Sequence, residues 1–276
     1  MANRKTGWER SNRSHFDEIV ISYDKVRPEY PGEMFEDIIQ YTGWAKGGKA
    51  LEIGAGTGKA TAPLLSAGWE VTAVEVGLNM AAFLREKFRG NKNFKVTVSS
   101  FEDAMLKEES YDLIYAASAF HWVDAKIGCP KAFCLLKSGG TFALMRYNPN
   151  PPAGDELYEE IQAVYEKYYY SYYELAQRPK KKSDDEFWEP SEISRGYGFE
   201  DIREYGFYDV HTKLYPSELI YGADEYIAFL DTLADHKGLP DSNREALYEG
   251  IGRAISGFGG SHKVQYMFQL YMGRKP

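Results

Sequence analysis

Three glycines spaced two residues apart follow a short apolar run near residue 50 of the chain. The apolar run is Ala50 to Ile53, the glycines are Gly54, Gly56 and Gly58, and residues 59–67 have a helical pattern. This order predicts a strand, a tight turn and a helix. Because glycine has no Cβ atom, such a turn can adopt backbone angles that other residues avoid, and a ligand can approach its main chain closely.

A carboxylate ends the next apolar run, Val71 to Val74. This residue, Glu75, comes about twenty positions after the first glycine, which is the separation expected across a βαβ unit. The carboxyl ends of two parallel strands meet at the same edge of a sheet, so we expect Glu75 beside the glycine turn. There it can accept hydrogen bonds from two adjacent ribose hydroxyls, and the unit therefore predicts a cofactor that contains a nucleoside.

The spacing of the glycines distinguishes two classes of cofactor. A dinucleotide-binding turn has its third glycine three residues after the second, whereas Gly58 comes only two residues after Gly56. In addition, Glu52 precedes the first glycine, and a carboxylate there would repel a pyrophosphate. The same carboxylate is favourable near the ammonium and sulfonium groups of S-adenosylmethionine (SAM). We therefore expect SAM as the cofactor. The alternative is that the cofactor is NAD and the protein an NAD-dependent oxidoreductase.

Strand-like and helix-like segments alternate along the first half of the chain. Besides those already named, helices are predicted over 33–41, 80–88 and 125–136, and strands over 94–98, 111–117 and 141–145. This alternation predicts an α/β fold with a doubly wound, Rossmann-like, mostly parallel sheet. Further strands are predicted within 205–215 and over 263–272, and the glycine turn before the last one predicts a terminal antiparallel hairpin.

Composition changes along the chain predict four segments. These are an N-terminal arm and lid segment (1–32), a SAM-binding Rossmann-like core (33–148), an inserted aromatic helical cap (149–200) and a C-terminal completion of the sheet with two helices (201–276). The cap contains a tyrosine-rich helix over 155–177, and at most half of its clustered tyrosines are expected to point inward. Asp235 and His236 are adjacent on a predicted helix, so their side chains are expected to point apart.

Charge and cysteine content limit the classes of partner. The formal net charge is −8, which disfavours nucleic acid as a partner, because a protein that neutralises many phosphates has a basic surface. The two cysteines, Cys129 and Cys134, are not spaced with histidines as in a zinc site, and no metal site is expected. No segment has the length and apolarity of a membrane span. We expect a cytoplasmic monomer or homodimer without a membrane partner.

Taken together, six motifs resemble those of the class I SAM-dependent methyltransferases, particularly the small-molecule branch that includes trans-aconitate methyltransferase-like proteins. The resemblance covers about residues 23–145. The motifs are YDKVRPEYP, LEIGAGTGKAT, VTAVE, SSFED, YDLIYAASAFHWVD and LLKSGGTFAL.

The resemblance implies a binding site for SAM and for its product, S-adenosylhomocysteine (SAH). The cofactor is expected along the glycine turn, with its ribose at Glu75 and its methionine carboxylate at Tyr23 and Arg27. Relatives usually have an aspartate that meets the adenine amino group, and this chain has Ser100 there, which leaves Glu102 or a backbone carbonyl as the partner. The implied cofactor-binding residues are Tyr23, Arg27, Glu52, Gly54, Ala55, Gly56, Thr57, Gly58, Glu75, Val76, Met80, Ser100, Phe101, Glu102, Ala117 and Phe120.

His121 is the candidate catalytic residue, because its loop follows the strand whose carboxyl end is expected to face the methyl acceptor. It can act as a base, donate a hydrogen bond to the acceptor, or bridge its own loop. The expected reaction is in-line methyl transfer to an oxygen, nitrogen or carboxyl group of a small molecule, and a base is needed only if the acceptor arrives protonated. The alternative in another class is a non-catalytic SAM-binding module whose cap contacts a partner.

Overall fold

The computed structural model describes residues 15–44, 47–175 and 178–276, and the chain folds into two compact units. The first unit comprises Met1–Pro28, Pro149–Lys181 and Ser217–Tyr266, and so combines residues of the predicted arm, cap and C-terminal segment. The second unit comprises Glu29–Asn148, Lys182–Pro216 and Met267–Pro276. Among the described residues, no helix combines the length and apolarity needed to cross a membrane.

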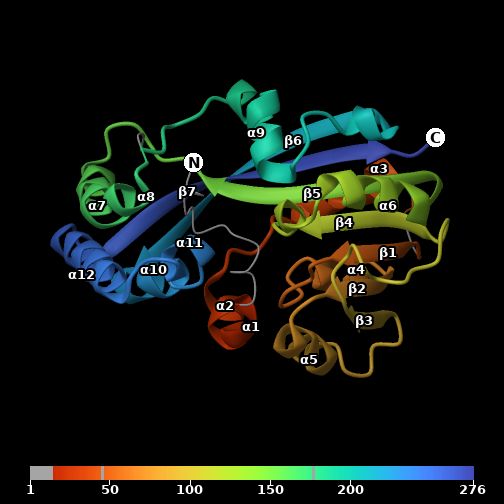
Figure 1. Cartoon of the computed structure of the whole chain (residues 1–276), viewed down its shortest axis with the longest axis horizontal. Helices are drawn as coiled ribbons and strands as arrows, with labels where there is room; N and C mark the ends of the chain where they lie inside the picture. The colour runs from red at the N-terminus through yellow and green to blue at the C-terminus, as the bar shows by residue number, and fades with distance from the viewer. Residues whose placement is uncertain (1–14, 45–46, 176–177) are drawn as a thin grey trace. The chain divides into compact units, whose positions relative to one another are not determined.

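A seven-stranded sheet has the strand order β3-β2-β1-β4-β5-β7-β6 (Figure 1). Neighbouring strands from β3 to β5 pair in parallel, whereas β7 runs in the opposite direction and forms an antiparallel pair with β6. This topology confirms the predicted doubly wound, mostly parallel sheet with an antiparallel end. The strands are β1 (Lys49–Ile53), β2 (Glu70–Glu75), β3 (Phe94–Val98), β4 (Tyr111–Ala117), β5 (Leu136–Pro149), β6 (Tyr208–Gly222) and β7 (Ser261–Arg274).

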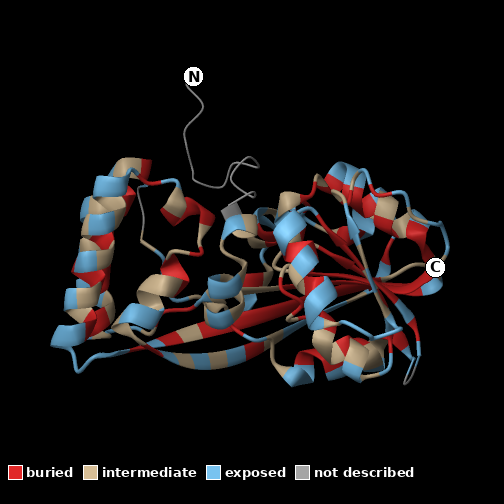
Figure 2. Ribbon diagram, turned by 90° about the horizontal axis from the view of Figure 1, so that it is seen from below, coloured by how far each residue is buried: buried red, intermediate tan, exposed pale blue. Residues whose placement is uncertain are grey.

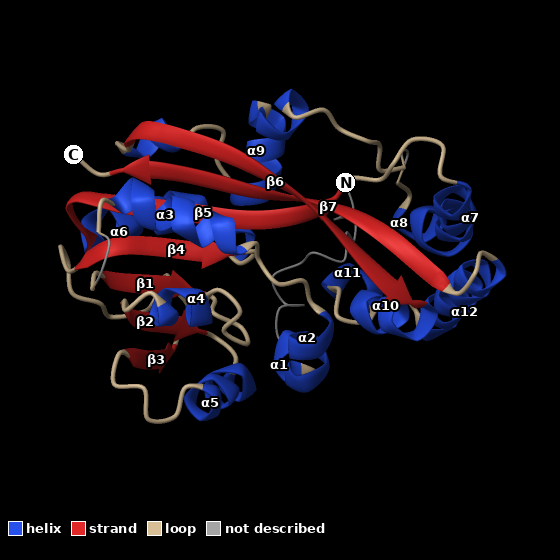
Figure 3. Ribbon diagram, turned by 180° about the vertical axis from the view of Figure 1, so that it is seen from behind, coloured by secondary structure: helices blue, strands red, loops and turns tan. Residues whose placement is uncertain are grey.

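Helices cover both faces of the sheet in the second unit, which explains why β1 and β4 are buried along almost their whole length. α3 (Gly32–Thr42) and α4 (Thr61–Ser66) lie on one face, and α6 (Ala125–Leu135) and α9 (Pro190–Tyr197) lie on the other (Figures 1 and 3). Buried residues follow the strands between them (Figure 2). The remaining elements of this unit are α5 (Leu78–Lys87), η2 (Phe120–Trp122), η4 (Asp185–Trp188) and η5 (Ile202–Tyr205).

The boundaries of the central strands match the predictions closely, and those of the last strands do so less well. β3 and β4 coincide with the predicted ranges 94–98 and 111–117. β5 is longer than the predicted 141–145, and β6 continues past the predicted 205–215 to Gly222. Three helices separate β6 from β7 in the chain, so the antiparallel pair is closed by a helical connection and not by the glycine turn alone.

The first unit is mostly helical. Its predicted tyrosine-rich helix is not regular, because a π-helix, η3 (Glu166–Tyr170), follows α7 (Glu156–Tyr165) and leads into the short α8 (Ser171–Tyr173). Asp155 begins α7 as a cap, since its carboxylate accepts a hydrogen bond from the Tyr158 amide at 2.8 Å. The other helices are α1 (His15–Glu18), α2 (Val20–Val26), α10 (Ala223–Leu230), α11 (Ala234–Lys237) and α12 (Asp241–Gly257).

The π-helix changes which tyrosines are buried. In a regular α-helix successive side chains point in directions about 100° apart, but the wider i→i+5 turn of a π-helix changes the direction of the residues that follow it. Tyr169 and Tyr170 are consequently both buried, as are Tyr165 and Tyr173. The prediction that at most half of the clustered tyrosines point inward was therefore wrong.

The prediction that Asp235 and His236 point apart was also wrong. α11 has only four residues, and the two side chains meet, with 3.2 Å between Asp235 Oδ1 and His236 Nδ1. His236 Nε2 lies 2.9 Å from the Tyr165 hydroxyl, and the Tyr169 hydroxyl donates to Asp235 Oδ2. Burial acts to raise the pKa of Asp235, but the charge and hydrogen bonds of its partners lower that pKa below its ordinary value. Asp235 is thus a buried anion whose charge is compensated by named neighbours.

Candidate functional site

The glycine turn after β1 has the backbone geometry that its sequence predicts. Gly54, Gly56 and Gly58 have φ values of +66°, +55° and +82°. All three lie in the left-handed region, which residues with a Cβ atom rarely adopt. The turn therefore requires glycine at these positions and exposes main-chain groups instead of side chains.

The glycine turn lies against the loop that follows β4. A Cβ atom added to Gly54 would come within 2.7 Å of the Ala119 Cβ atom, so the two loops are in close contact. β1 and β4 are neighbours, and they lie where the strand order changes direction. Ligands of doubly wound folds bind at this position, outside the carboxyl ends of the strands.

Glu75 lies at the carboxyl end of β2, directly beside the glycine turn. Its Oε2 accepts a hydrogen bond from the Gly56 amide at 2.8 Å, and its Oε1 accepts one from the Gly77 amide at 2.9 Å. Gly77 is the N-cap residue of α5, so the carboxylate satisfies one of the amides at the start of this helix. A carboxylate offers about four acceptor positions, so Glu75 can bond to ribose hydroxyls as well as to backbone amides. Glu75 therefore lies beside the glycine turn, as predicted.

Glu52 lies beneath the glycine turn. Its side chain is only 1% exposed, and Oε2 accepts hydrogen bonds from the Thr61 hydroxyl at 2.5 Å and the Tyr115 hydroxyl at 2.8 Å. Burial raises the pKa of Glu52 to about 7, and the negative charge of Glu75 acts in the same direction. Sequence reasoning missed Tyr115, although a tyrosine inside a buried strand is a signal for a buried polar partner.

Thr57 gives a direct test of whether the turn suits a polar ligand. Its hydroxyl is buried, and within the described residues it has no hydrogen-bond partner. Its carbonyl oxygen accepts a hydrogen bond from Lys87 Nζ at 2.9 Å, which fixes the turn from the side of α5. A buried hydroxyl without a partner is unfavourable, so a ligand that supplies one is stabilised at this turn. The residues present therefore fit the predicted cofactor.

The expected adenine-binding residues surround the ends of β2 and β3. Met80 and Phe101 are buried, whereas the Val76 side chain is 43% exposed. The Ser100 hydroxyl donates to Asp103 Oδ2 at 2.6 Å, and Glu102 Oε1 accepts from the Asp124 amide at 3.2 Å. These two polar side chains thus have local partners already, and their contact with an adenine amino group stays a prediction.

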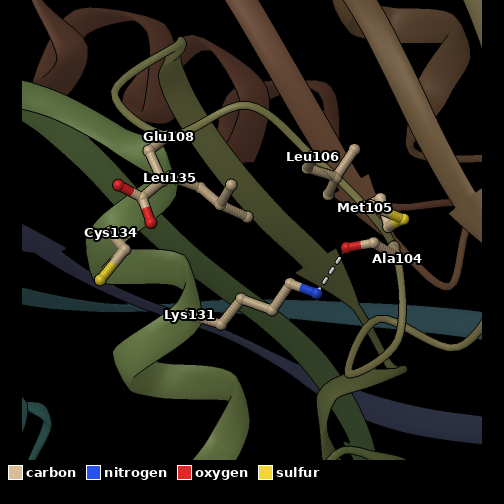
Figure 4. Close-up of a pocket in the computed structure, with 7 residues that line it drawn as sticks. All are labelled: Ala104, Met105, Leu106, Glu108, Lys131, Cys134 and Leu135. Carbon is tan, nitrogen blue, oxygen red and sulfur yellow. Dashed lines mark hydrogen bonds between the residues drawn. The ribbon is translucent and has the colours of Figure 1, made fainter.

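A hollow of about 440 Å³ lies between α6 and the segment that joins β3 to β4 (Figure 4). Lys131 Nζ donates to the carbonyl oxygens of Glu102 and Ala104 at 2.9 and 2.6 Å and lies over the Phe101 ring. This lysine joins α6 to the expected adenine loop. The lining residues are Ala104, Met105, Leu106, Glu108, Lys131, Cys134 and Leu135, and none belongs to the expected cofactor site.

The loop after β4 combines a strained residue, a buried aromatic ring and an exposed histidine. Ser118 has a φ of +50°, which is unusual for a residue with a side chain, and its amide donates to the Met145 carbonyl at 2.8 Å. Phe120 is buried, so it supports the loop from below. His121 is exposed, with its ring centroid 5.0 Å from that of Trp122. The histidine is therefore accessible, as an acid-base residue must be.

Tyr30 is a residue of this site that sequence reasoning did not single out. Its hydroxyl donates to the Ser118 hydroxyl at 2.8 Å, and its ring has edge contacts with Tyr147 and Phe268. The contact joins residues 88 positions apart in the chain. Only its presence in the YDKVRPEYP motif could have indicated this residue.

Tyr23 and Arg27 belong to the first unit. Arg27 Nη2 donates to the Thr232 carbonyl at 2.7 Å, and its guanidinium carbon lies 4.8 Å from the centroid of the Tyr23 ring. Their expected contact with a methionine carboxylate stays a prediction.

Comparisons with known proteins identify the central segment. The family described as "Methyltransferase domain" matches residues 51–144. The uncharacterised methyltransferase Rv3342 of Mycobacterium tuberculosis is 31% identical over 130 residues, which cover 47% of this chain and 51% of the relative. Another relative is the Saccharomyces cerevisiae protein named probable S-adenosylmethionine-dependent methyltransferase CRG1. It is 29% identical to this chain over 205 residues, which cover 71% of this chain and 66% of the relative.

Several solved structures resemble almost the whole chain, and one of them is given as an example. This example is an Anaeromyxobacter dehalogenans protein provisionally identified as a type II methyltransferase. The two structures have a TM-score of 0.61 and a sequence identity of 20%, and the match covers 90% of this chain and 97% of the other. At this identity the likeness supports the fold alone. The chain spans about half the length of the mycobacterial relatives that it matches.

Proposed function

We propose that this protein transfers a methyl group from SAM to a small-molecule acceptor, and that residues 51–144 form its methyltransferase domain, which is of the class I SAM-dependent type. The family match and the names of the relatives support this domain class and SAM as its cofactor. The trans-aconitate-like branch, the acceptor and the atom methylated belong to the proposal. The observation that supports it most is the Glu75 carboxylate, hydrogen-bonded to a glycine turn whose three glycines have positive φ.

Bound SAM supplies a methyl group that is already activated on its sulfonium, so an acceptor atom can attack it in line and leave SAH. The residues of this chain then have to position the two reactants and keep water out. The close contact between the glycine turn and Ala119 brings the expected cofactor and acceptor loops together. Ser118 and Tyr30 present two hydroxyl groups at the same loop.

The net charge of −8 favours a small acceptor over a nucleic acid, because nucleic-acid binding needs a basic surface. The second candidate function is a SAM-binding module without catalysis. Incubation with SAM labelled on its methyl group and a panel of small carboxylic acids, amines and alcohols distinguishes the two. Transfer of label to any acceptor supports the enzyme, whereas binding of SAM without transfer across the panel supports the module.

Replacement of Glu75 is expected to weaken SAM binding strongly. Glu75→Ala removes the acceptor of both ribose hydroxyls and frees the Gly56 amide, so SAM affinity should fall by on the order of 2 to 4 kcal/mol, or roughly thirtyfold to a thousandfold. Glu70→Ala is the matched control, because Glu70 lies at the other end of β2 with its side chain 60% exposed. Titration calorimetry measures both variants. Unchanged affinity in a Glu75→Ala protein that melts like wild type would show that the site lies elsewhere.

Replacement of His121 should leave SAM binding nearly intact, since the residue is assigned to the acceptor side of the methyl group. His121→Ala is compared by calorimetry with His211→Ala, which removes another exposed histidine on β6. Loss of SAM binding in a folded His121→Ala protein would place this histidine among the cofactor contacts instead.

Once an acceptor is known, the pH dependence of turnover separates two roles of His121. If it is a base, wild-type turnover should rise with pH as the imidazole loses its proton, and His121→Asn should flatten this rise and lower turnover roughly a hundredfold. If it only donates a hydrogen bond, the same variant should mainly raise the Michaelis constant of the acceptor, because asparagine can still donate.

A further inference from the structure

Glu52 is part of a polar cluster on one face of the parallel sheet. Its partners in the strand register are Ala73 on β2 and Tyr115 on β4. Register partners in a parallel sheet project to the same face, and so does Glu75, two residues after Ala73. Thr61 of α4 covers this face and donates to the Glu52 carboxylate. The sheet thus brings two carboxylic acids and two hydroxyls together under the glycine turn.

The cluster compensates the charge of Glu52 only in part. Tyr115 and Thr61 donate hydrogen bonds to Glu52, but both are neutral, and Glu75 is itself an acid. In the described part of the chain, no lysine, arginine or histidine forms an ion pair with Glu52. A buried carboxylate that lacks a cation is ionised at a cost, and a positive ligand nearby lowers that cost.

SAM and SAH differ in the charge that this carboxylate would meet. SAM has a positive sulfonium, which becomes a neutral thioether in SAH, while the amino and carboxyl groups are the same. Interactions between charges weaken little in a buried, poorly solvated region. An ionised Glu52 therefore favours SAM, and a protonated Glu52 removes that preference.

We propose that Glu52 is a proton switch that makes the preference of this protein for SAM over SAH depend on pH. The proposal rests on the proposed function, since it takes the glycine turn to be the cofactor site. Binding of SAM favours the ionised carboxylate and releases a proton, whereas SAH is held equally well by the protonated form. Because the pKa of Glu52 is about 7, the switch operates near neutral pH.

The test is calorimetric and needs no acceptor. The ratio of the dissociation constant of SAH to that of SAM is measured between about pH 5.5 and 7, below the range in which α-amino groups lose their protons. For the wild type this ratio should rise as the pH is raised. The total rise should be about tenfold for each unit by which bound SAM lowers the pKa of Glu52. Titrations in buffers of different ionisation enthalpy should show proton release with SAM and less with SAH. In Glu52→Gln both effects should disappear.

Tyr115→Phe provides a second variant if Glu52→Gln does not fold. It removes one donor to the ionised carboxylate, so the rise of the ratio should persist but move to higher pH. Circular dichroism checks the fold of both variants.

The outcomes separate this proposal from the proposed function. A wild type that binds neither SAM nor SAH would overturn both. A wild type that binds both ligands with a ratio independent of pH overturns the proton switch alone. A pH-dependent ratio that persists in folded Glu52→Gln assigns the effect to another group and also overturns it.

Discussion

Gly56→Val is expected to abolish SAM binding, with a loss of affinity of at least about a hundredfold. Gly56 has a φ of +55°, and a β-branched residue resists such an angle because its Cβ substituents collide with the backbone. The amide of Gly56 also donates to Glu75, so a shift of the turn disturbs the expected ribose contact. In addition, the valine side chain would occupy space through which the ligand approaches the main chain. Titration calorimetry with SAM measures the loss.

Gly68→Val is the matched control for backbone strain. Gly68 has a φ of +86°, and a Cβ atom there would meet no atom within 4 Å. It precedes β2, at the end of the strand opposite to Glu75. The control should lower the melting temperature and keep SAM binding. If Gly56→Val bound SAM within threefold of wild type, with an unchanged circular dichroism spectrum, the glycine turn would not be the cofactor site.

Asp235→Ala is expected to lower the free energy of unfolding of the first unit by about 3 to 5 kcal/mol. The substitution removes the partner of both His236 Nδ1 and the Tyr169 hydroxyl, and these buried polar groups are then left without compensation. Chemical denaturation monitored by tyrosine fluorescence measures the change. Asp241→Ala is the control, because Asp241 forms an ion pair with Arg244 while 82% exposed, and it should cost less than about 1 kcal/mol.

The contribution of Asp235 to stability should depend on pH. Since its pKa is lowered in the folded protein, the stabilisation is present above its ordinary pKa of 3.8 and is lost as the pH falls through the folded value. The difference between wild type and Asp235→Ala should therefore be constant near neutral pH and shrink below about pH 4. A difference that stays the same at acidic pH would mean that the carboxylate charge is not what stabilises the network.

The glycine turn and the central strands could be predicted because their signals are local. The positions of Gly54 to Gly58 require unusual backbone angles, and the apolar runs at 94–98 and 111–117 have the length of buried strands. Glu75 followed from the geometry of a βαβ unit, which fixes the distance between the turn and the next strand end. Each of these features depends on residues that are close in sequence.

The features that could not be predicted depend on residues distant in sequence or on irregular helices. Tyr115 reaches Glu52 only through the register of β1 with β4, and Tyr30 meets Ser118 across 88 positions. The buried tyrosines follow from a π-helix, for which the sequence gives no simple pattern. Asp235 and His236 meet in a network whose other members, Tyr169 and Tyr165, lie 66 and 71 positions away in the chain.

The division of the chain into units has a consequence for its evolution. The boundaries fall after Pro28, Asn148, Lys181, Pro216 and Tyr266, and β6 and β7 each contribute residues to both units. A gene recombined once at one of these points would encode a chain in which at least one unit combines segments from two parent genes. Neither unit can therefore be exchanged between genes as a single cassette. Coding sequences for the two units are interleaved in one gene, so they are inherited together.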